Sequence, residues 1–298
     1  MRLLLLFGLL VVAAAAEVVP LVGYHEAVGI PEAARIKAAE EQIIARQGQR
    51  IVGGNIAPIN AHPYLAGLVI SLVNIAGNSA CGSSLLSANR LVTAAHCWFD
   101  GNNQAWQFQV VLGSQYLFSG GTRIATSQVV MHSQWTPTTL ANDVAVIYLP
   151  TNNNPKNNIC CVISASIQPI ALPLTTDLNQ DFAGFWSVAA GYGKTSDAQT
   201  GVTASTLVSE VNLQVITTSA CQAVFGAWAQ PTNICTNGAG GVGICGGDSG
   251  GPLLVERNGQ KFLVGISSFV AAAGCQLGFP SAFARVTSFH NFILQHLF

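Results

Sequence analysis

The stretch that decides the fold is ICGGDSGGPL, from Ile244 to Leu253. An aspartate and a serine stand side by side among glycines, shortly after a cysteine. Glycine-flanked Asp-Ser is ordinary turn chemistry, because both side chains hydrogen-bond nearby backbone and glycine supplies a positive φ. The same glycines would also let the backbone of a substrate approach a nucleophilic serine. The remainder of the chain has to decide between these two interpretations.

The composition indicates a β-rich protein that does not bind nucleic acid or membranes. Only 8% of the 298 residues are charged, against about 25% in typical soluble domains. The net charge of −1 offers no electrostatic basis for binding nucleic acid or an anionic membrane. Short apolar runs such as DVAVIYLP (143–150) and KFLVGISSFV (261–270) are bounded by turn residues, which favours an all-β architecture. Residues 287–298 keep a helical spacing and predict a terminal helix.

The N-terminal part of the chain predicts a leader and a separate segment. Arg2 gives residues 1–16 a basic start, an apolar run follows, and Ala14, Ala15 and Ala16 form a small-residue cleavage site, which is typical of a secretory signal peptide. This run is too short to span a hydrocarbon core of ~30 Å. Residues 17–50 contain no cysteine, and Pro31 to Arg46 is rich in helix formers after a proline. We therefore expect a secreted protein with a helical N-terminal segment that ends at Arg50.

Metal and cofactor sites are not expected. Eight cysteines in a secreted chain are interpreted as disulfides before metal ligands. No Cys-x-x-Cys pair is present, and no cysteine and histidine cluster has the spacing of a zinc site. Residues 101–135 contain no Asp or Glu, so a calcium site there is not expected either.

Three further stretches bear on the role of Ser249. LVTAAHC places His96 beside a cysteine, NDVAVIYL begins an apolar strand with Asp143, and RIVGG puts Arg50 before a small apolar sequence. Each has an ordinary structural interpretation on its own. With GDSGGPL and FARVTSF they make residues 51–298 resemble the chymotrypsin/trypsin family of serine endopeptidases. The stretch GYHEAVGIPEAARIKAAEE (23–41) is in addition similar to propeptides of insect, particularly lepidopteran, midgut chymotrypsin-like enzymes.

The resemblance implies a fold and a division of the chain. We expect two packed six-stranded antiparallel β-barrels at about 51–165 and 166–285, with a C-terminal helix at about 287–298. The peptidase domain would then occupy residues 51–298, after a signal peptide (1–16) and an activation propeptide (17–50).

The resemblance also implies catalytic roles with clear chemical reasons. A serine hydroxyl is a poor nucleophile and needs an adjacent base, which is the role expected of His96 toward Ser249. A buried carboxylate, Asp143, would fix the imidazole tautomer and offset its charge, with Ser268 supporting that aspartate. The backbone N–H groups of Gly247 and Ser249 would form the oxyanion hole.

Activation is expected to depend on a new charge. In the resemblance, a trypsin-like protease cuts after Arg50, and the freed α-amino group of Ile51 pairs with Asp248. Before the cut, position 51 has no ammonium group to offer, so the uncut chain would be inactive.

The implied substrate pocket has no carboxylate at its base, so trypsin-like specificity is not expected. Gly243 lies at the base, and Val270 and Ser281 form the wall. Gly243 deepens the pocket, whereas Val270 narrows it. We expect a preference for large apolar residues, with an elastase-like preference for small aliphatic residues as the alternative.

The resemblance pairs six of the cysteines as Cys81–Cys97, Cys221–Cys235 and Cys245–Cys275. Cys160 and Cys161 are left over, and a vicinal disulfide, free thiols and intermolecular bonds all remain open for them. The expected protein is a monomeric, secreted digestive endopeptidase, located in the gut lumen. Its partners would be protein and peptide substrates, the activating protease and protein protease inhibitors. The contrasting interpretation is a homologue that has lost catalysis.

Overall fold

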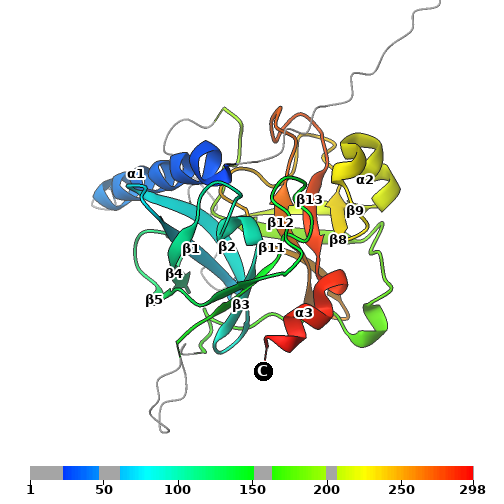
Figure 1. Ribbon diagram of the computed structural model, residues 1–298, viewed down its shortest axis with the longest axis horizontal. Helices are drawn as coiled ribbons and strands as arrows, with labels where there is room; N and C mark the ends of the chain where they lie inside the picture. The colour runs from blue at the N-terminus through cyan, green and yellow to red at the C-terminus, as the bar shows by residue number, and fades with distance from the viewer. Residues whose placement is uncertain (1–22, 47–60, 151–162, 199–206, 298) are drawn as a thin grey trace, which may run out of the picture.

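The computed structural model describes residues 23–46, 61–150, 163–198 and 207–297. Two β-sheets pack against each other, with helices at their edges (Figure 1). The expected all-β architecture is therefore confirmed. The expected signal peptide, the expected cleavage site at Arg50–Ile51 and the pair Cys160 and Cys161 lie outside the described residues.

The first sheet is antiparallel and contains seven strands in the order β5-β4-β1-β2-β3-β7-β6. Among the described residues its edge strands β5 and β6 do not pair with each other, so it is a curled half-barrel and not the closed six-stranded barrel that was expected. Both edge strands are short, which limits the ladder that they could offer each other. The strands are β1 (Leu65–Leu72), β2 (Asn78–Ser87), β3 (Arg90–Thr93), β4 (Ala105–Leu112), β5 (Thr122–Thr126), β6 (Val129–Met131) and β7 (Ala145–Tyr148).

The second sheet closes into a barrel in the order β10-β13-β12-β11-β8-β9. Its β12 is buried along most of its length, because one face packs into the barrel and the other against neighbouring segments. The strands are β8 (Trp186–Gly191), β9 (Ser209–Ile216), β10 (Asn233–Thr236), β11 (Pro252–Arg257), β12 (Gln260–Phe269) and β13 (Ser281–Arg285).

The helices are few and lie outside the sheets. The expected helix from Pro31 to Arg46 is confirmed as α1 (Ile30–Arg46), preceded by one π-helical turn, η1 (His25–Gly29). The C-terminal helix α3 (His290–Gln295) is shorter than expected, because a 3₁₀ turn, η6 (Val286–Phe289), takes its first residues. The others are α2 (Thr218–Phe225) and the 3₁₀ turns η2 (Ala95–Cys97), η3 (Thr175–Asp177) and η5 (Gly226–Trp228).

Helix α1 lies along the outside of the first sheet, against β2 (Figure 1). Its buried residues Ala33 and Ile36 belong to the same hydrophobic cluster as the first sheet. They are three residues apart, and Ala39 and Ile43 continue the buried stripe at helical spacing. No helix in the described part of the chain is long and apolar enough to cross a bilayer.

Candidate active site

His96 and Asp143 meet because of how two strands pair. β3 and β7 run antiparallel with Thr93 opposite Ala145, so the turn after β3 lies next to the residue just before β7. There His96 Nδ1 and Asp143 Oδ2 are 2.7 Å apart, and the backbone N–H of His96 donates to Asp143 Oδ1 at 2.9 Å. Both residues are buried. The carboxylate therefore holds His96 at two points, one on the imidazole and one on the backbone.

Ser268, on β12 of the second sheet, completes the environment of the aspartate. Its hydroxyl donates to Asp143 Oδ2 at 2.6 Å. The structure therefore brings together three of the residues singled out from the sequence, from both sheets.

Ser249 stands in the tight turn that leads into β11. Asp248 N donates to Cys245 O at 3.1 Å, and Gly251 N donates to Asp248 O at 2.9 Å. Gly250 has a φ of +78°, and a Cβ there would lie 2.1 Å from Thr93 Oγ1. Gly247 has a φ of +97°. Only glycine adopts these conformations without strain, so the glycines of the opening motif are needed for the turn that carries the serine.

The expected bond between His96 and Ser249 is not present in the structure. His96 Nε2 is buried and has no hydrogen-bond partner among the described residues. The ring of Tyr24, from the N-terminal segment, lies against the imidazole with 4.5 Å between ring centroids. Tyr24 also lines the same cavity as Ser249. A residue that the sequence analysis did not single out thus occupies the space beside both groups.

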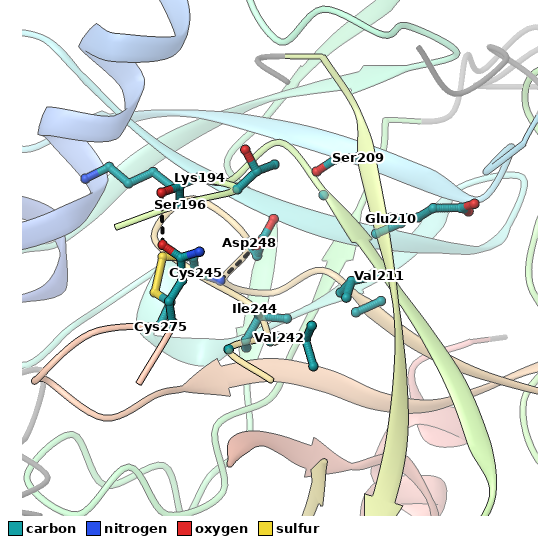
Figure 2. A pocket seen from close by; sticks show the side chains of 17 residues that line it. Lys194, Ser196, Ser209, Glu210, Val211, Val242, Ile244, Cys245, Asp248 and Cys275 are labelled. Carbon is teal, nitrogen blue, oxygen red and sulfur yellow. Dashed lines mark hydrogen bonds between the residues drawn. A yellow bond between two sulfur atoms is a disulfide. The ribbon is translucent and has the colours of Figure 1, made fainter. Parts of the chain in front are cut away.

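Asp248 points into a cavity of about 220 Å³. Its carboxylate accepts hydrogen bonds from Gly193 N at 2.9 Å and Cys245 N at 3.0 Å. Burial nevertheless raises the pKa of Asp248 to about 6, because the surrounding protein desolvates the charged form. Figure 2 shows Asp248 in this cavity with Val242 and Ile244 on one side.

The three expected pocket residues fall into two groups. Gly243 and Ser281 are neighbours, since a Cβ on Gly243 would lie 2.6 Å from Ser281 Oγ, and that oxygen accepts from Ile244 N at 3.2 Å. Val270 lines a second cavity, of about 330 Å³, together with Ser249.

The structure contains the three disulfides Cys81–Cys97, Cys221–Cys235 and Cys245–Cys275, which are the pairs implied by the resemblance. Cys81–Cys97 joins β2 to the turn that carries His96. The sulfurs near His96 and near Asp197 are thus all engaged in disulfides, and in the described residues these clusters offer no free thiolate to a metal ion.

Comparison with known proteins identifies this arrangement. A family model described as Trypsin matches residues 51–293. The chain belongs to the trypsin family. Like other members of the family, it is a serine endopeptidase with protein or peptide substrates, as the contacts among His96, Asp143 and Ser268 lead one to expect.

Arthropod members of the trypsin family are similar over most of the chain. Collagenase of Hypoderma lineatum is 34% identical over 251 residues, which cover 84% of this chain and 88% of that protein. Brachyurin of Leptuca pugilator is 36% identical over 82% of this chain and 96% of its own length. A solved structure titled HL collagenase matches with a TM-score of 0.70 and 31% identity, and covers 83% of this chain and 98% of that one. The fold is therefore chymotrypsin-like.

Two parts of the site escaped the sequence analysis. Tyr24 and His25 lie in GYHE, a stretch that contributed to the resemblance without receiving a role. Lys194 Nζ lies 2.8 Å from Glu32 Oε1 of α1, and Figure 2 shows its side chain extending from the cavity toward that helix. The amphipathic spacing of α1 indicates that it docks on something, but a spacing does not name the partner.

Proposed function

We propose that His96, Asp143 and Ser249 are the catalytic residues of this endopeptidase. The observation that supports this most is the hydrogen bond between His96 Nδ1 and Asp143 at 2.7 Å, since it leaves Nε2 as the free basic nitrogen. With the cleft open, Nε2 takes the proton of the Ser249 hydroxyl as the oxygen attacks the substrate carbonyl. The imidazolium then protonates the leaving amine, and water hydrolyses the acyl-enzyme with the same base.

The backbone N–H groups of Gly247 and Ser249 stabilise the oxyanion in this proposal. The positive φ of Gly247 supports it, because backbone amides in such turns converge on an anion. Loss of one oxyanion donor typically costs about 3 kcal/mol of barrier height. The carboxylate of Asp143 is held by Ser268 and by two contacts from His96, so this part of the site is preorganised.

Activation follows cleavage after Arg50 in the same proposal. The freed α-amino group of Ile51 enters the cavity at Asp248 and forms an ion pair with it. Two properties of Asp248 support this: its carboxylate opens on a cavity of about 220 Å³ lined in part by apolar side chains, and burial raises its pKa. A buried carboxylate that is costly to ionise gains most from a new cation.

Specificity for large apolar residues is supported by the lining of the second cavity, which includes Ile244, Phe269 and Val270. Asp197 also lines this cavity, but its carboxylate accepts hydrogen bonds from the backbone N–H groups of Cys275 and Gln276. Val270 beside Ser249 favours the alternative, a preference for small aliphatic residues. Secretion and digestion remain part of the proposal, on the basis of the leader sequence, the disulfides and the resemblance.

The test is active-site labelling and substrate profiling. The full chain is cut with trypsin, purified away from the propeptide at low concentration, and treated with a fluorophosphonate probe and a peptide library. We expect labelling in the wild type and none in Ser249→Ala. Cleavage after Phe, Tyr, Leu or Met supports the main proposal, and cleavage after Ala and Val the alternative. No labelling of the cut, separated wild-type protein would indicate the non-catalytic homologue instead.

A further inference from the structure

The N-terminal segment is docked in the active-site cleft. Tyr24 is 1% exposed, although it precedes the proposed cleavage site and belongs to neither sheet. Its hydroxyl donates to Ala80 O on β2 at 2.8 Å. Its ring lies against His96, and it lines the same cavity as Ser249. One tyrosine thus stands beside both the proposed base and the proposed nucleophile.

The turn η1 that follows Tyr24 is held by polar contacts of its own. The backbone N–H of His25 donates to Asp100 Oδ2 at 2.9 Å, and its ring nitrogen Nδ1 lies 2.8 Å from Ser79 Oγ. His25, Ser79 and Asp100 are all buried. Gly29, the last residue of this turn, lies close to β2, because a Cβ there would lie 1.9 Å from Ser79 Oγ.

Helix α1 is attached at two points by carboxylates. In its first turn, Glu32 pairs with Lys194 Nζ at 2.8 Å. Further along the helix, Glu40 accepts hydrogen bonds from the backbone N–H groups of Leu117 and Phe118. Both glutamates are buried. Buried carboxylates with specific partners are characteristic of a defined interface and not of a loosely associated surface segment.

The segment also covers the cavity beside Ser249. The lining of this 330 Å³ space includes Tyr24, Val28 and Pro31 from the N-terminal segment, facing Val270 from the enzyme. A Cβ on Gly246 would lie 3.2 Å from Val28 Cγ1, so the segment approaches the loop of the nucleophile closely. A substrate chain would have to occupy the same volume.

We propose that residues 23–46 act as an inhibitor that binds the active-site cleft, within the uncut chain and, after cleavage, as a separate peptide. This inference rests on the proposed function. It adds a second restraint on activity to the missing ammonium group, because forming the Ile51–Asp248 pair does not by itself remove Tyr24 from its place beside His96 and Ser249. Activation then has two steps, the cut and the departure of the peptide.

The experiment uses the full chain cut after Arg50 and separated from its propeptide, to which a synthetic peptide of residues 17–50 is added. We expect competitive inhibition of the hydrolysis of a short fluorogenic peptide, and slower fluorophosphonate labelling. Tyr24→Ala should raise the inhibition constant about 100-fold, since removal of a buried aromatic ring is among the costliest truncations. Ile44→Ala on the same helix is the matched control, because Ile44 is 46% exposed, and should change the constant less than about twofold.

The outcomes separate this inference from the proposed function. Active enzyme that the wild-type peptide does not inhibit, or that the Tyr24→Ala peptide inhibits equally well, would overturn the inference alone. Enzyme with neither activity nor labelling would overturn the proposed function. In that case, fluorescence anisotropy of the labelled peptides with the same cut protein still decides the docking, through the difference between Tyr24→Ala and Ile44→Ala. Mass spectrometry of the recovered peptide distinguishes inhibition from consumption as a substrate.

Discussion

Ser268 Oγ donates to the same oxygen of Asp143, Oδ2, that lies 2.7 Å from His96 Nδ1. Ser268 belongs to β12 of the barrel, whereas Asp143 precedes β7 of the first sheet. A single hydrogen bond of 2.6 Å therefore fixes the position of the proposed catalytic carboxylate across the junction of the two sheets. The orientation of the imidazole depends on it in turn.

Ser268→Ala should reduce kcat about 10- to 100-fold, because a hydrogen bond to a charged acceptor contributes about 1.5–3 kcal/mol. KM should change much less, since the hydroxyl acts through Asp143. Ser267→Ala is the matched control: it is the neighbouring buried serine of β12, whereas the serine hydrogen bond to Asp143 Oδ2 comes from Ser268. Steady-state kinetics on both variants, with Ser268→Thr as a partial rescue, checks this. Equal losses in the two alanine variants would mean that the serine is merely structural.

Gly250→Ala should abolish activity and destabilise the fold, whereas Gly259→Ala should do neither severely. Their φ angles are nearly equal, +78° and +77°, so both substitutions carry the same backbone penalty of about 1–2 kcal/mol. At Gly250 a Cβ would also meet Thr93 Oγ1 and Gly82 O, whereas at Gly259 it meets nothing within 4 Å. The difference between the two variants in thermal unfolding and in kcat/KM measures the effect of the steric clash at Gly250. Equal losses in both variants would contradict a steric role for Gly250.

Gly29→Ala should weaken propeptide binding even though alanine favours a helix by up to about 1 kcal/mol. The added Cβ would lie 1.9 Å from Ser79 Oγ, and that hydroxyl is already engaged by His25. We expect the dissociation constant of the peptide to rise at least about 10-fold, since overpacking costs about 1–3 kcal/mol. Anisotropy titrations of the peptide measure this. Enzyme carrying Ser79→Ala should lose much of the discrimination between the wild-type peptide and the Gly29→Ala peptide, and an unchanged discrimination would refute the steric account.

Propeptide docking should depend on pH through two groups with opposite signs. Burial lowers the pKa of His25 to about 4, opposed by Asp100 and reinforced by His96. Burial raises the pKa of Glu40 to about 7, opposed by the amides of Leu117 and Phe118 and by Arg123. Free values are about 6.5 and 4.3. Docking is therefore lost through His25 as pH falls from about 6.5 to 4, and through Glu40 as pH rises from about 4.3 to 7.

Single substitutions should separate the pH dependence of binding that comes from His25 from the one that comes from Glu40. The Glu40→Gln peptide should bind more tightly as pH rises from 4 to 6.5, and the His25→Gln peptide less tightly as pH rises from 4.5 to 7. Glu41→Gln, on the exposed side of α1, is the control and should follow the wild type. Anisotropy with Ser249→Ala enzyme measures binding without turnover. All peptides bind the same enzyme, so titration of enzyme groups such as Asp248 cancels in the comparison. An identical pH dependence of binding for the Glu40→Gln and His25→Gln peptides would contradict the roles given to these two residues.

Much of the fold and the chemistry was predictable from local sequence. Turn residues among apolar runs predicted the β architecture, and the glycines around Ser249 predicted a turn with positive φ or a close backbone approach, because both are properties of single residues. The helix from Pro31 to Arg46 followed from its composition in the same way. The closure of a sheet is different, since it depends on whether distant edge strands reach each other. For that reason the open edge between β5 and β6 was not foreseen.

The contact of Tyr24 with His96 was not predictable for a related reason. Nothing in the local pattern of GYHE distinguishes an exposed tyrosine from one that enters a cleft, because burial of this ring depends on β2 and on loops far away in the chain. From the sequence alone, the uncut chain was expected to be inactive only because it lacks the ammonium group of Ile51. The buried Nε2 of His96 indicates that the occupied cleft matters as well.

Residues 17–50 contain no cysteine, and the three disulfides among the described residues all lie within residues 51–293, which the trypsin family model matches. Once the chain is cut, only reversible contacts retain α1 and Tyr24. The fraction of enzyme that is free then depends on total protein concentration, so a concentrated store would remain restrained after cleavage. Dilution would then release the peptide from the cleft, and the rate of this dissociation would set when proteolysis begins.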